Sequence, residues 1–312
     1  MSIDIAVRQL GLCGNPYKHE IRPAIATVLD LCVRRRIAVA LSRELADLCG
    51  RGDLGREDAE LVATSDVMVA LGGDGTMLAT ARLIGDSGTP LLGINLGSLG
   101  YLTDIPVSGL ATAIARVLDG DFVLAGRSRV HCTIWRRGET IAEVAGLNDV
   151  VVNMGAPPRA LDLELRLGGT SLGRFLGDGV IFATATGSTA YSLSAGGAIC
   201  QPEVPGLLVT PICPHSLGVR PLILGDDVDI EMVLHAVGDG ATLTADGQVA
   251  TPLARHDRLA CHLTPPRVRL VKFPDSDFFE VLRHKLNWGV APRLRDSSGR
   301  CGPGCTGDSE DS

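Results

Sequence analysis

The spacing of the apolar residues differs between the first third of this 312-residue chain and the rest of it. In its first third, apolar runs with the spacing of buried strands alternate with helical patterns. The strands are expected at 5–12, 66–71 and 90–95, and the helices at 20–34, 76–84 and 108–118. Strands that alternate with helices predict a parallel sheet with helices on both faces. This pattern limits the N-terminal region to an α/β fold.

After about residue 125, apolar residues tend to recur at every second position. Between residues 160 and 167 leucines alternate with charged residues, which is typical of a strand with one buried face. Further short strands are expected at 130–135, 150–154, 228–234, 241–245 and 259–263. These short runs, separated by Gly, Pro and Asp, predict an antiparallel β domain. The Asp277–Glu280 spacing is typical of a capping box and predicts a last helix that ends near Leu286.

The charge balance limits the classes of partner. Arginine and lysine number 29 against 36 acidic residues, which gives a formal net charge of −7. Nucleic acids and anionic membranes bind positively charged protein surfaces, so neither is an expected partner of this acidic chain. The sequence lacks an apolar run long enough to cross a membrane, and its N-terminus does not follow a signal-peptide plan. Nine scattered cysteines favour reduced thiols, and we expect a cytoplasmic protein.

Of the 38 glycines, several form three clusters that follow predicted strands. The first cluster, Gly72-Gly73-Asp74-Gly75-Thr76, comes between a strand and a helix. Glycines let the backbone approach a ligand closely, and the start of a helix favours phosphate. A carboxylate would repel phosphate, so Asp74 is better suited to act as a base or to hold a hydroxyl or a metal ion. The alternative is a plain strand-to-helix turn that Asp74 caps.

The other two clusters lie at 93–102 and 177–197, and the last is rich in hydroxyl groups around Tyr191. Such a stretch could contact a sugar and a ring, or could be an ordinary loop that leads into a short helix. Several common nucleotide and hydrolase motifs are missing from the sequence: there is no P-loop, no G-x-G-x-x-G after a strand and no G-x-S-x-G.

The order of these motifs resembles that of bacterial NAD kinases. The resemblance rests on Gly72–Thr76 and Asn148-Asp149, and continues through the blocks at 186–191, 211–217, 220–222 and 246–248. It covers roughly residues 5 to 290. It implies an enzyme that phosphorylates the adenosine-ribose 2′-hydroxyl of NAD to give NADP, with ATP or polyphosphate as the donor.

The resemblance also assigns roles to residues. It implies that Asp74 is the general base, and we expect the backbone of Gly72, Gly73, Gly75 and Thr76 to hold the donor phosphates. The expected NAD-binding residues, which all match positions of the family, are Asp74, Gly75, Asn148, Asp149, Asp178, Thr189, Ala190, Tyr191, Ser194, Asp246 and Gln248. No carboxylate cluster suggests a resident metal site, so Mg²⁺ is expected to arrive with ATP. Ala185 departs from the family, which usually has proline there.

The implied architecture is a Rossmann-like α/β domain over 1–125 and a β-sandwich domain over 126–270. A segment over 271–292 is expected to return to the first domain, and a disordered tail to follow over 293–312. The family implies a homodimer or homotetramer. Two other functions stay open at this point: a lipid or diacylglycerol kinase with a similar glycine loop, and a nucleotide-binding sensor without turnover.

Overall fold

A computed structural model describes residues 6–97, 100–156 and 158–289. These form a large unit that extends to Ser276 and a small C-terminal unit from Asp277, which are described separately. The described part of the small unit contains helix α7 (Phe278–Leu286), and the Asp277 side chain caps this helix by accepting a hydrogen bond from the Phe279 amide. The tail predicted at 293–312, with Cys301 and Cys305, lies outside the described residues.

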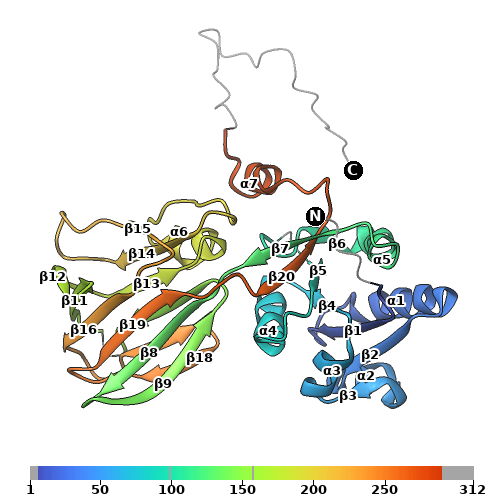
Figure 1. Cartoon of the computed structure of the whole chain (residues 1–312), viewed down its shortest axis with the longest axis horizontal. Coiled ribbons are helices and arrows are strands. Elements are labelled where there is room, and N and C mark those ends of the chain that lie inside the picture. The colour runs from blue at the N-terminus through green and yellow to red at the C-terminus, as the bar shows by residue number, and fades with distance from the viewer. Residues whose placement is uncertain (1–5, 98–99, 157, 290–312) are drawn as a thin grey trace, which may run out of the picture. The chain divides into compact units, whose positions relative to one another are not determined.

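The first sheet of the large unit has eight strands (Figure 1). They are β1 (Gln9–Gly14), β2 (Ala38–Ser42), β3 (Gly55–Arg56), β4 (Val67–Gly72), β5 (Leu91–Asn95), β6 (Ile105–Pro106), β7 (Val123–Arg127) and β20 (Val268–Lys272). The order is β3-β2-β1-β4-β5-β20-β7, with β6 paired to β5. All pairs are parallel except that of β20 with β7. Thus β20, which comes late in the chain, lies between β5 and β7 of this sheet.

Helices cover both faces of this sheet, as the alternating pattern predicts. One face packs against α1 (Ile21–Arg35), α2 (Arg43–Cys49) and α5 (Leu110–Leu118). The other packs against α3 (Asp58–Thr64) and α4 (Asp74–Ile84). Because α1 follows β1 and α4 follows β4, the chain leaves these neighbouring strands toward opposite faces. Open α/β sheets bind ligands at such a point, outside the carboxyl ends of the strands.

The remaining strands form two antiparallel sheets of six strands each. One has the order β12-β11-β16-β19-β8-β9. Its strands are β8 (Val130–Arg136), β9 (Glu139–Gly146), β11 (Leu161–Leu167), β12 (Thr170–Gly177), β16 (Ile230–Ala236) and β19 (Arg258–Leu263). The other has the order β15-β14-β13-β10-β17-β18. Its strands are β10 (Asp149–Asn153), β13 (Gly179–Ala183), β14 (Gly206–Ile212), β15 (Leu222–Gly225), β17 (Thr242–Ala245) and β18 (Val249–Pro252).

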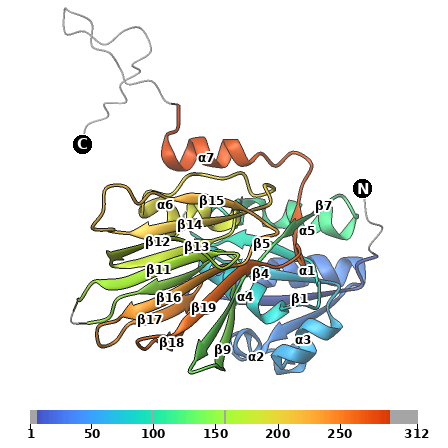
Figure 2. The same ribbon diagram turned by 60° about the vertical axis from the view of Figure 1, so that its left-hand side comes forward.

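The two antiparallel sheets share one core, and this makes them a sandwich. Phe182 and Val152 of one sheet and Leu163 and Met232 of the other belong to the same buried cluster. The outer face of the β10–β13–β14 sheet has its own smaller core, to which Ala185 and Cys200 contribute. Figure 2 shows the short helix α6 (Tyr191–Ser194) beside β13. The predicted fold class, an α/β domain followed by a β-sandwich, is therefore confirmed.

Several elements of the structure were not predicted from the sequence, and β2 and α2 are two of them in the first sheet region. They follow α1 directly, and α2 is only seven residues long, too short for a helical period to be visible. The strand predicted at 5–12 is present as Gln9–Gly14, shifted toward the C-terminus. The domain boundaries at 125 and 270 stay predictions.

Candidate active site

The Gly72–Thr76 cluster joins β4 to α4 at the carboxyl edge of the first sheet. Gly72 is required by the fold, because a Cβ there would lie 2.2 Å from the Thr76 Oγ1. A Cβ at Gly73 or Gly75 would meet no atom within 4 Å. Neither glycine is needed by the packing of the chain itself. The open space beside them leaves the backbone accessible to a ligand.

Asp74 is the first residue of α4, and its carboxylate is bound by the segment after β5. Its Oδ1 accepts hydrogen bonds from the Leu102 amide (3.2 Å), the Thr103 amide (3.1 Å) and the Thr103 hydroxyl (2.9 Å). Its Oδ2 accepts one bond, from the Tyr101 amide at 2.8 Å. The N-cap of α4 is Gly73, so the interpretation of Asp74 as a helix cap is wrong. The carboxylate is oriented by other parts of the chain, and Oδ2 keeps room for a further donor.

Helix α4 presents two faces to two cavities. Residues four apart lie on one face of a helix, so Asp74 points to the same side as Leu78, which lines the first cavity. Thr76, Thr80 and Leu83 share the other side and line the second cavity. The start of α4 therefore lies between the two cavities.

The first cavity encloses about 380 Å³ and contains several of the expected NAD-binding residues. Those in its wall are Asn148, Asp149, Ala190, Tyr191 and Asp246. The other wall residues are Leu78, Val151, Asn153, Met154, Thr242, Thr244 and Gly247. Tyr191 is 41% exposed, so its ring is available for contact with a ligand.

Three polar wall residues were missed in the sequence: Asn153, Thr242 and Thr244. Asn153 lies on the same face of β10 as Asp149, four residues earlier, and pairs with Thr242 across to β17. Thr244 is two residues further along β17 and shares its face. The period-two spacing of Thr242 and Thr244 was visible in the sequence. Their pairing with β10 was not.

Asp246 positions the backbone of the predicted Asn148-Asp149 pair. Its Oδ1 accepts hydrogen bonds from the amides of Asn148 (2.8 Å) and Asp149 (3.2 Å), and its Oδ2 accepts one from Leu147 (2.8 Å). Asp246 has a positive φ of 50° and also donates its own amide to the Asp149 carbonyl. Burial raises the pKa of the Asp246 carboxyl, and the three backbone hydrogen bonds oppose that shift. The Asp246 carboxylate thus holds the turn that carries two ligand-facing side chains.

Asp149 is a buried carboxyl group in the wall of the first cavity, with 5% of its surface exposed. Burial, and then the nearby Asp246 carboxylate, raise its pKa to about 7. In the absence of a ligand, a negative charge on the buried Asp149 beside the Asp246 carboxylate destabilises the folded protein. A ligand with hydroxyl groups would lower that cost by donating hydrogen bonds to the carboxylate.

Replacing Asp149 with asparagine is expected to stabilise the protein without ligands at pH 8. In the unfolded chain this carboxyl ionises near pH 4, but in the folded protein it does so near pH 7. The free energy of unfolding therefore falls as the pH rises through this window, by an amount on the order of 2–4 kcal/mol. The gain from Asp149→Asn should be present at pH 8 and shrink toward pH 5, as measured by urea denaturation. Asp239→Asn, at an exposed turn, is the control; an equal gain there, or a gain independent of pH, contradicts the prediction.

The hydroxyl-rich segment at 184–194 divides into structural and ligand-facing residues. Thr184 donates its hydroxyl to the Leu147 carbonyl (2.7 Å), and the Ser188 hydroxyl bonds to both the amide and the carbonyl of Cys200. These side chains are buried, whereas Thr189, Ala190 and Tyr191 are partly or largely exposed. Ala185, which stands where proline is usual, has a φ of −56°, close to the value that proline imposes.

The remaining expected residues lie around the cavity but are not among its wall residues. Asp178 accepts a hydrogen bond at its carbonyl from the amide of Met154, which is in the wall. Ser194 is the last residue of the one-turn helix α6 (Tyr191–Ser194) and is exposed. Gln248 contacts α4: it hydrogen-bonds the Arg82 side chain and donates to the Gly75 carbonyl at 3.4 Å. Gln248 thus connects the sandwich to the glycine cluster.

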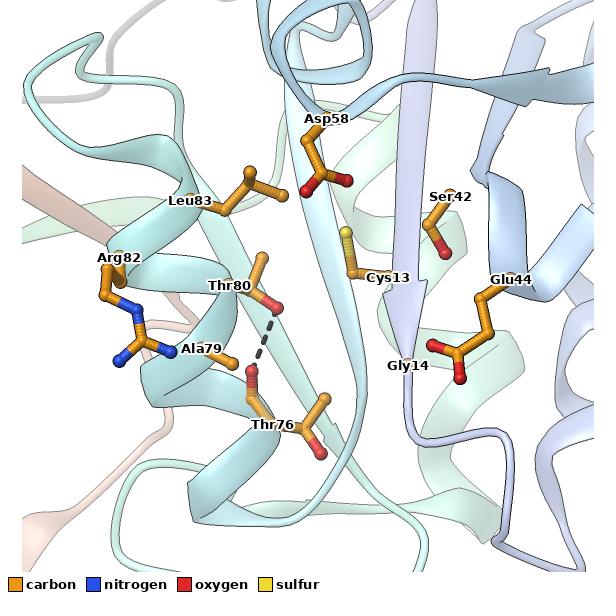
Figure 3. Close-up of a pocket in the computed structure, with 10 residues that line it drawn as sticks. All are labelled: Cys13, Gly14, Ser42, Glu44, Asp58, Thr76, Ala79, Thr80, Arg82 and Leu83. Carbon is orange, nitrogen blue, oxygen red and sulfur yellow. Dashed lines mark hydrogen bonds between the residues drawn. The ribbon is translucent and has the colours of Figure 1, made fainter. Parts of the chain in front are cut away.

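The second cavity encloses about 360 Å³ beside the carboxyl ends of β1 and β2 (Figure 3). Figure 3 shows the Asp58 and Glu44 carboxylates and the Thr80 hydroxyl facing a common space. Burial raises the pKa of the Cys13 thiol in this wall to about 12, so the thiol is neutral and unreactive. Thr76 also lines the cavity, which therefore reaches the glycine cluster.

Neither a metal centre nor a membrane span is found in the described ranges. Over residues 6–97, 100–156 and 158–289, no three His, Cys, Asp or Glu side chains are grouped as a metal would need. In the same part of the chain, no helix is both long and apolar enough to cross a membrane.

Comparisons with known proteins give consistent matches. Residues 54–122 match the model of the ATP-NAD kinase N-terminal domain, and residues 147–273 that of the ATP-NAD kinase C-terminal domain. The chain is 41% identical over 255 residues to the NAD kinase of Syntrophotalea carbinolica, covering 82% of this chain and 90% of that one. It is 38% identical over 290 residues to the NAD kinase of Acidobacterium capsulatum, covering 91% and 99%. The crystal structure of yeast NADH kinase complexed with NADH superposes with a TM-score of 0.84 at 26% identity, covering 93% of this chain and 91% of that one.

Proposed function

The chain belongs to the NAD kinase family, and on that premise we propose that it transfers the γ-phosphoryl group of ATP to the adenosine-ribose 2′-hydroxyl of NAD. The observation that carries the proposal is the carboxylate of Asp74. It is held by four hydrogen bonds at the start of α4, between two cavities and beside an open glycine backbone. A fixed carboxylate in this position suits a general base for an alcohol.

In the proposed reaction, Asp74 orients the 2′-hydroxyl and takes its proton. The 2′-oxygen forms a bond to the γ-phosphorus, and the bond from that phosphorus to the bridging oxygen of ADP breaks. Phosphoryl transfer needs mainly alignment and charge neutralisation from the protein, and a carboxylate that is already held by four donors is well aligned.

NAD is proposed to occupy the first cavity. Asn148, Asp149 and Tyr191 line this cavity, and no side-chain or backbone group of the described residues donates a hydrogen bond to the Asp149 carboxylate. Ribose hydroxyl groups are donors of the right kind. Asp178, Thr189, Ser194 and Gln248 are proposed to contact parts of NAD that extend beyond this cavity.

ATP is proposed to lie across the carboxyl ends of the strands, with its phosphates on the backbone of Gly72–Thr76. Gly73 and Gly75 leave room for that approach, and the first turn of α4 provides free amides. The second cavity, which Thr76 borders, would take the nucleoside. Mg²⁺ is proposed to enter as part of the ATP complex, where it neutralises phosphate charge.

The two alternatives are not favoured. A lipid kinase would need an apolar acceptor site, whereas the first cavity presents carboxylate, amide and hydroxyl groups. A sensor without turnover would not need the aligned Asp74 carboxylate. Association into a homodimer or homotetramer, and a cytoplasmic location, are proposed from the family alone.

The proposal is tested by incubating the purified protein with ATP, Mg²⁺ and NAD, and measuring NADP with an NADP-specific dehydrogenase. We expect NADP to form in proportion to the protein added. Parallel reactions with polyphosphate in place of ATP, and with NADH in place of NAD, define the donor and the acceptor. Failure to form phosphorylated product with every donor would overturn the kinase assignment.

A further inference from the structure

Lys18 is a cation with an unusual position at the carboxyl edge of the first sheet. It lies in the loop between β1 and α1, and its Nζ is 3.3 Å from the point where a Cβ of Gly97 would lie. No carboxylate is paired with it among the residues that the structure describes. Lys272, by contrast, is bound to Asp104 at 2.7 Å. In a chain with three lysines and a net charge of −7, an exposed lysine without a counter-charge is well suited to bind an anion.

The strand order places Lys18 at one end of the proposed donor site. The strands follow one another as β2, β1, β4 and β5. Ser42 and Gly14 of the second cavity lie at the ends of β2 and β1, the glycine cluster at the end of β4, and Gly97 just after β5. Neighbouring strands are about 4.8 Å apart, so this row spans about 14 Å. A nucleoside in the second cavity and phosphates on the glycine cluster leave the terminal phosphate nearest to Gly97 and Lys18.

The segment after β5 connects Lys18 to the reacting groups. Lys18 lies over Gly97 of this segment, and the amides of Tyr101, Leu102 and Thr103 in the same segment hold Asp74. Asp74 is the residue that faces the acceptor hydroxyl in the proposed reaction. In the proposed reaction the phosphoryl group in transit lies beside Asp74, and Lys18 lies over Gly97, just after the neighbouring strand β5.

We infer that Lys18 binds the terminal phosphate of the donor and neutralises charge on the transferred phosphoryl group. This inference rests on the proposed kinase function. The reaction places negative charge on the equatorial oxygens of the phosphoryl group, and a fixed cation there stabilises the transition state more than the ground state. Lys18 thus supplies a side-chain charge at the terminal end of the donor, next to the backbone amides of the glycine cluster.

The experiment compares Lys18→Met, Lys18→Arg and the control Arg267→Met. Arg267 is exposed and precedes β20, at the opposite edge of the same sheet, so its variant removes one positive charge away from the site. We expect Lys18→Met to lower kcat roughly 10²-fold, Lys18→Arg to restore most of the activity, and Arg267→Met to stay within about twofold of the native protein. The KM for NAD should change little in all three, and thermal unfolding should confirm that each is folded.

Calorimetric titration with two donor analogues provides a readout that does not depend on turnover. Lys18→Met should bind Mg·AMP-PNP about tenfold more weakly than the native protein does, but bind Mg·ADP equally well, because only AMP-PNP has a terminal phosphate at the γ position. Equal losses for both analogues, or no loss for either, would overturn the inference. If the native protein forms no NADP, the kinase proposal fails, and the two titrations still decide whether Lys18 recognises the terminal phosphate.

Discussion

Asp74→Asn is expected to lower kcat by roughly 10²–10⁴-fold, the loss typical of removing a general base. The substitution keeps the size of the side chain, and its amide oxygen can accept the three hydrogen bonds that Oδ1 now receives from Leu102 and Thr103. The amide nitrogen would then face the Tyr101 amide, so that one bond is lost and no acceptor remains for the 2′-hydroxyl. Steady-state kinetics at saturating NAD and ATP measure the loss. NAD binding, followed by calorimetry, should persist.

Thr103→Val is the matched control for Asp74→Asn. Thr103 is buried, and valine has nearly its shape, so the variant removes one hydroxyl donor while the carboxylate and three amide donors stay. We expect it to lower kcat by about tenfold at most, because Asp74 loses orientation but not its chemistry. Near-native turnover in Asp74→Asn with intact NAD binding would exclude Asp74 as the base.

Gly100→Ala is expected to be nearly as damaging to activity, for a steric reason. A Cβ at Gly100 would lie 1.9 Å from the Asp74 Oδ1 and 2.3 Å from the Thr103 Oγ1, and no unstrained structure tolerates such contacts. Either the Asp74 carboxylate or the segment that holds it must move. A displacement of about 1 Å at a reacting group can cost about 10²-fold in rate, so we expect kcat to fall by roughly 10². The thermal midpoint should also fall, because the four hydrogen bonds to Asp74 are disturbed.

Gly75→Ala is the control for Gly100→Ala. It tests whether any larger residue in a glycine cluster lowers stability and kcat, or only one that displaces Asp74. A Cβ at Gly75 meets no protein atom within 4 Å, so the thermal midpoint should be unchanged or slightly higher. Its KM for ATP should rise, because the added methyl group occupies space proposed for the phosphates. If Gly100→Ala retains native kcat, the segment after β5 does not position Asp74 as described.

Much of the fold followed from local patterns in the sequence. The alternation of strands and helices predicted the α/β region, and the leucine alternation at 160–167 predicted a strand of the sandwich, found as Leu161–Leu167. The glycine cluster predicted the turn from β4 into α4, and Asp277 predicted the start of α7. These features depend on backbone sterics and on the spacing of apolar residues within each helix or strand. Both are set by residues that are close together in the sequence. The resemblance to a family motif was sufficient to select Asp74, Asn148 and Asp149 as candidate site residues.

The tertiary structure alone decided what surrounds those residues. The hydrogen bonds that Asp246 accepts from the amides at 147–149 join parts of the chain that no local pattern connects, and so do those that Asp74 accepts from the segment after β5. The pKa of about 7 at Asp149 is a consequence of burial and of the nearby Asp246. Lys18 reaches Gly97 because β1, β4 and β5 are adjacent. Proximity, burial and charge depend on sheet order and register, and these follow from how the whole chain packs.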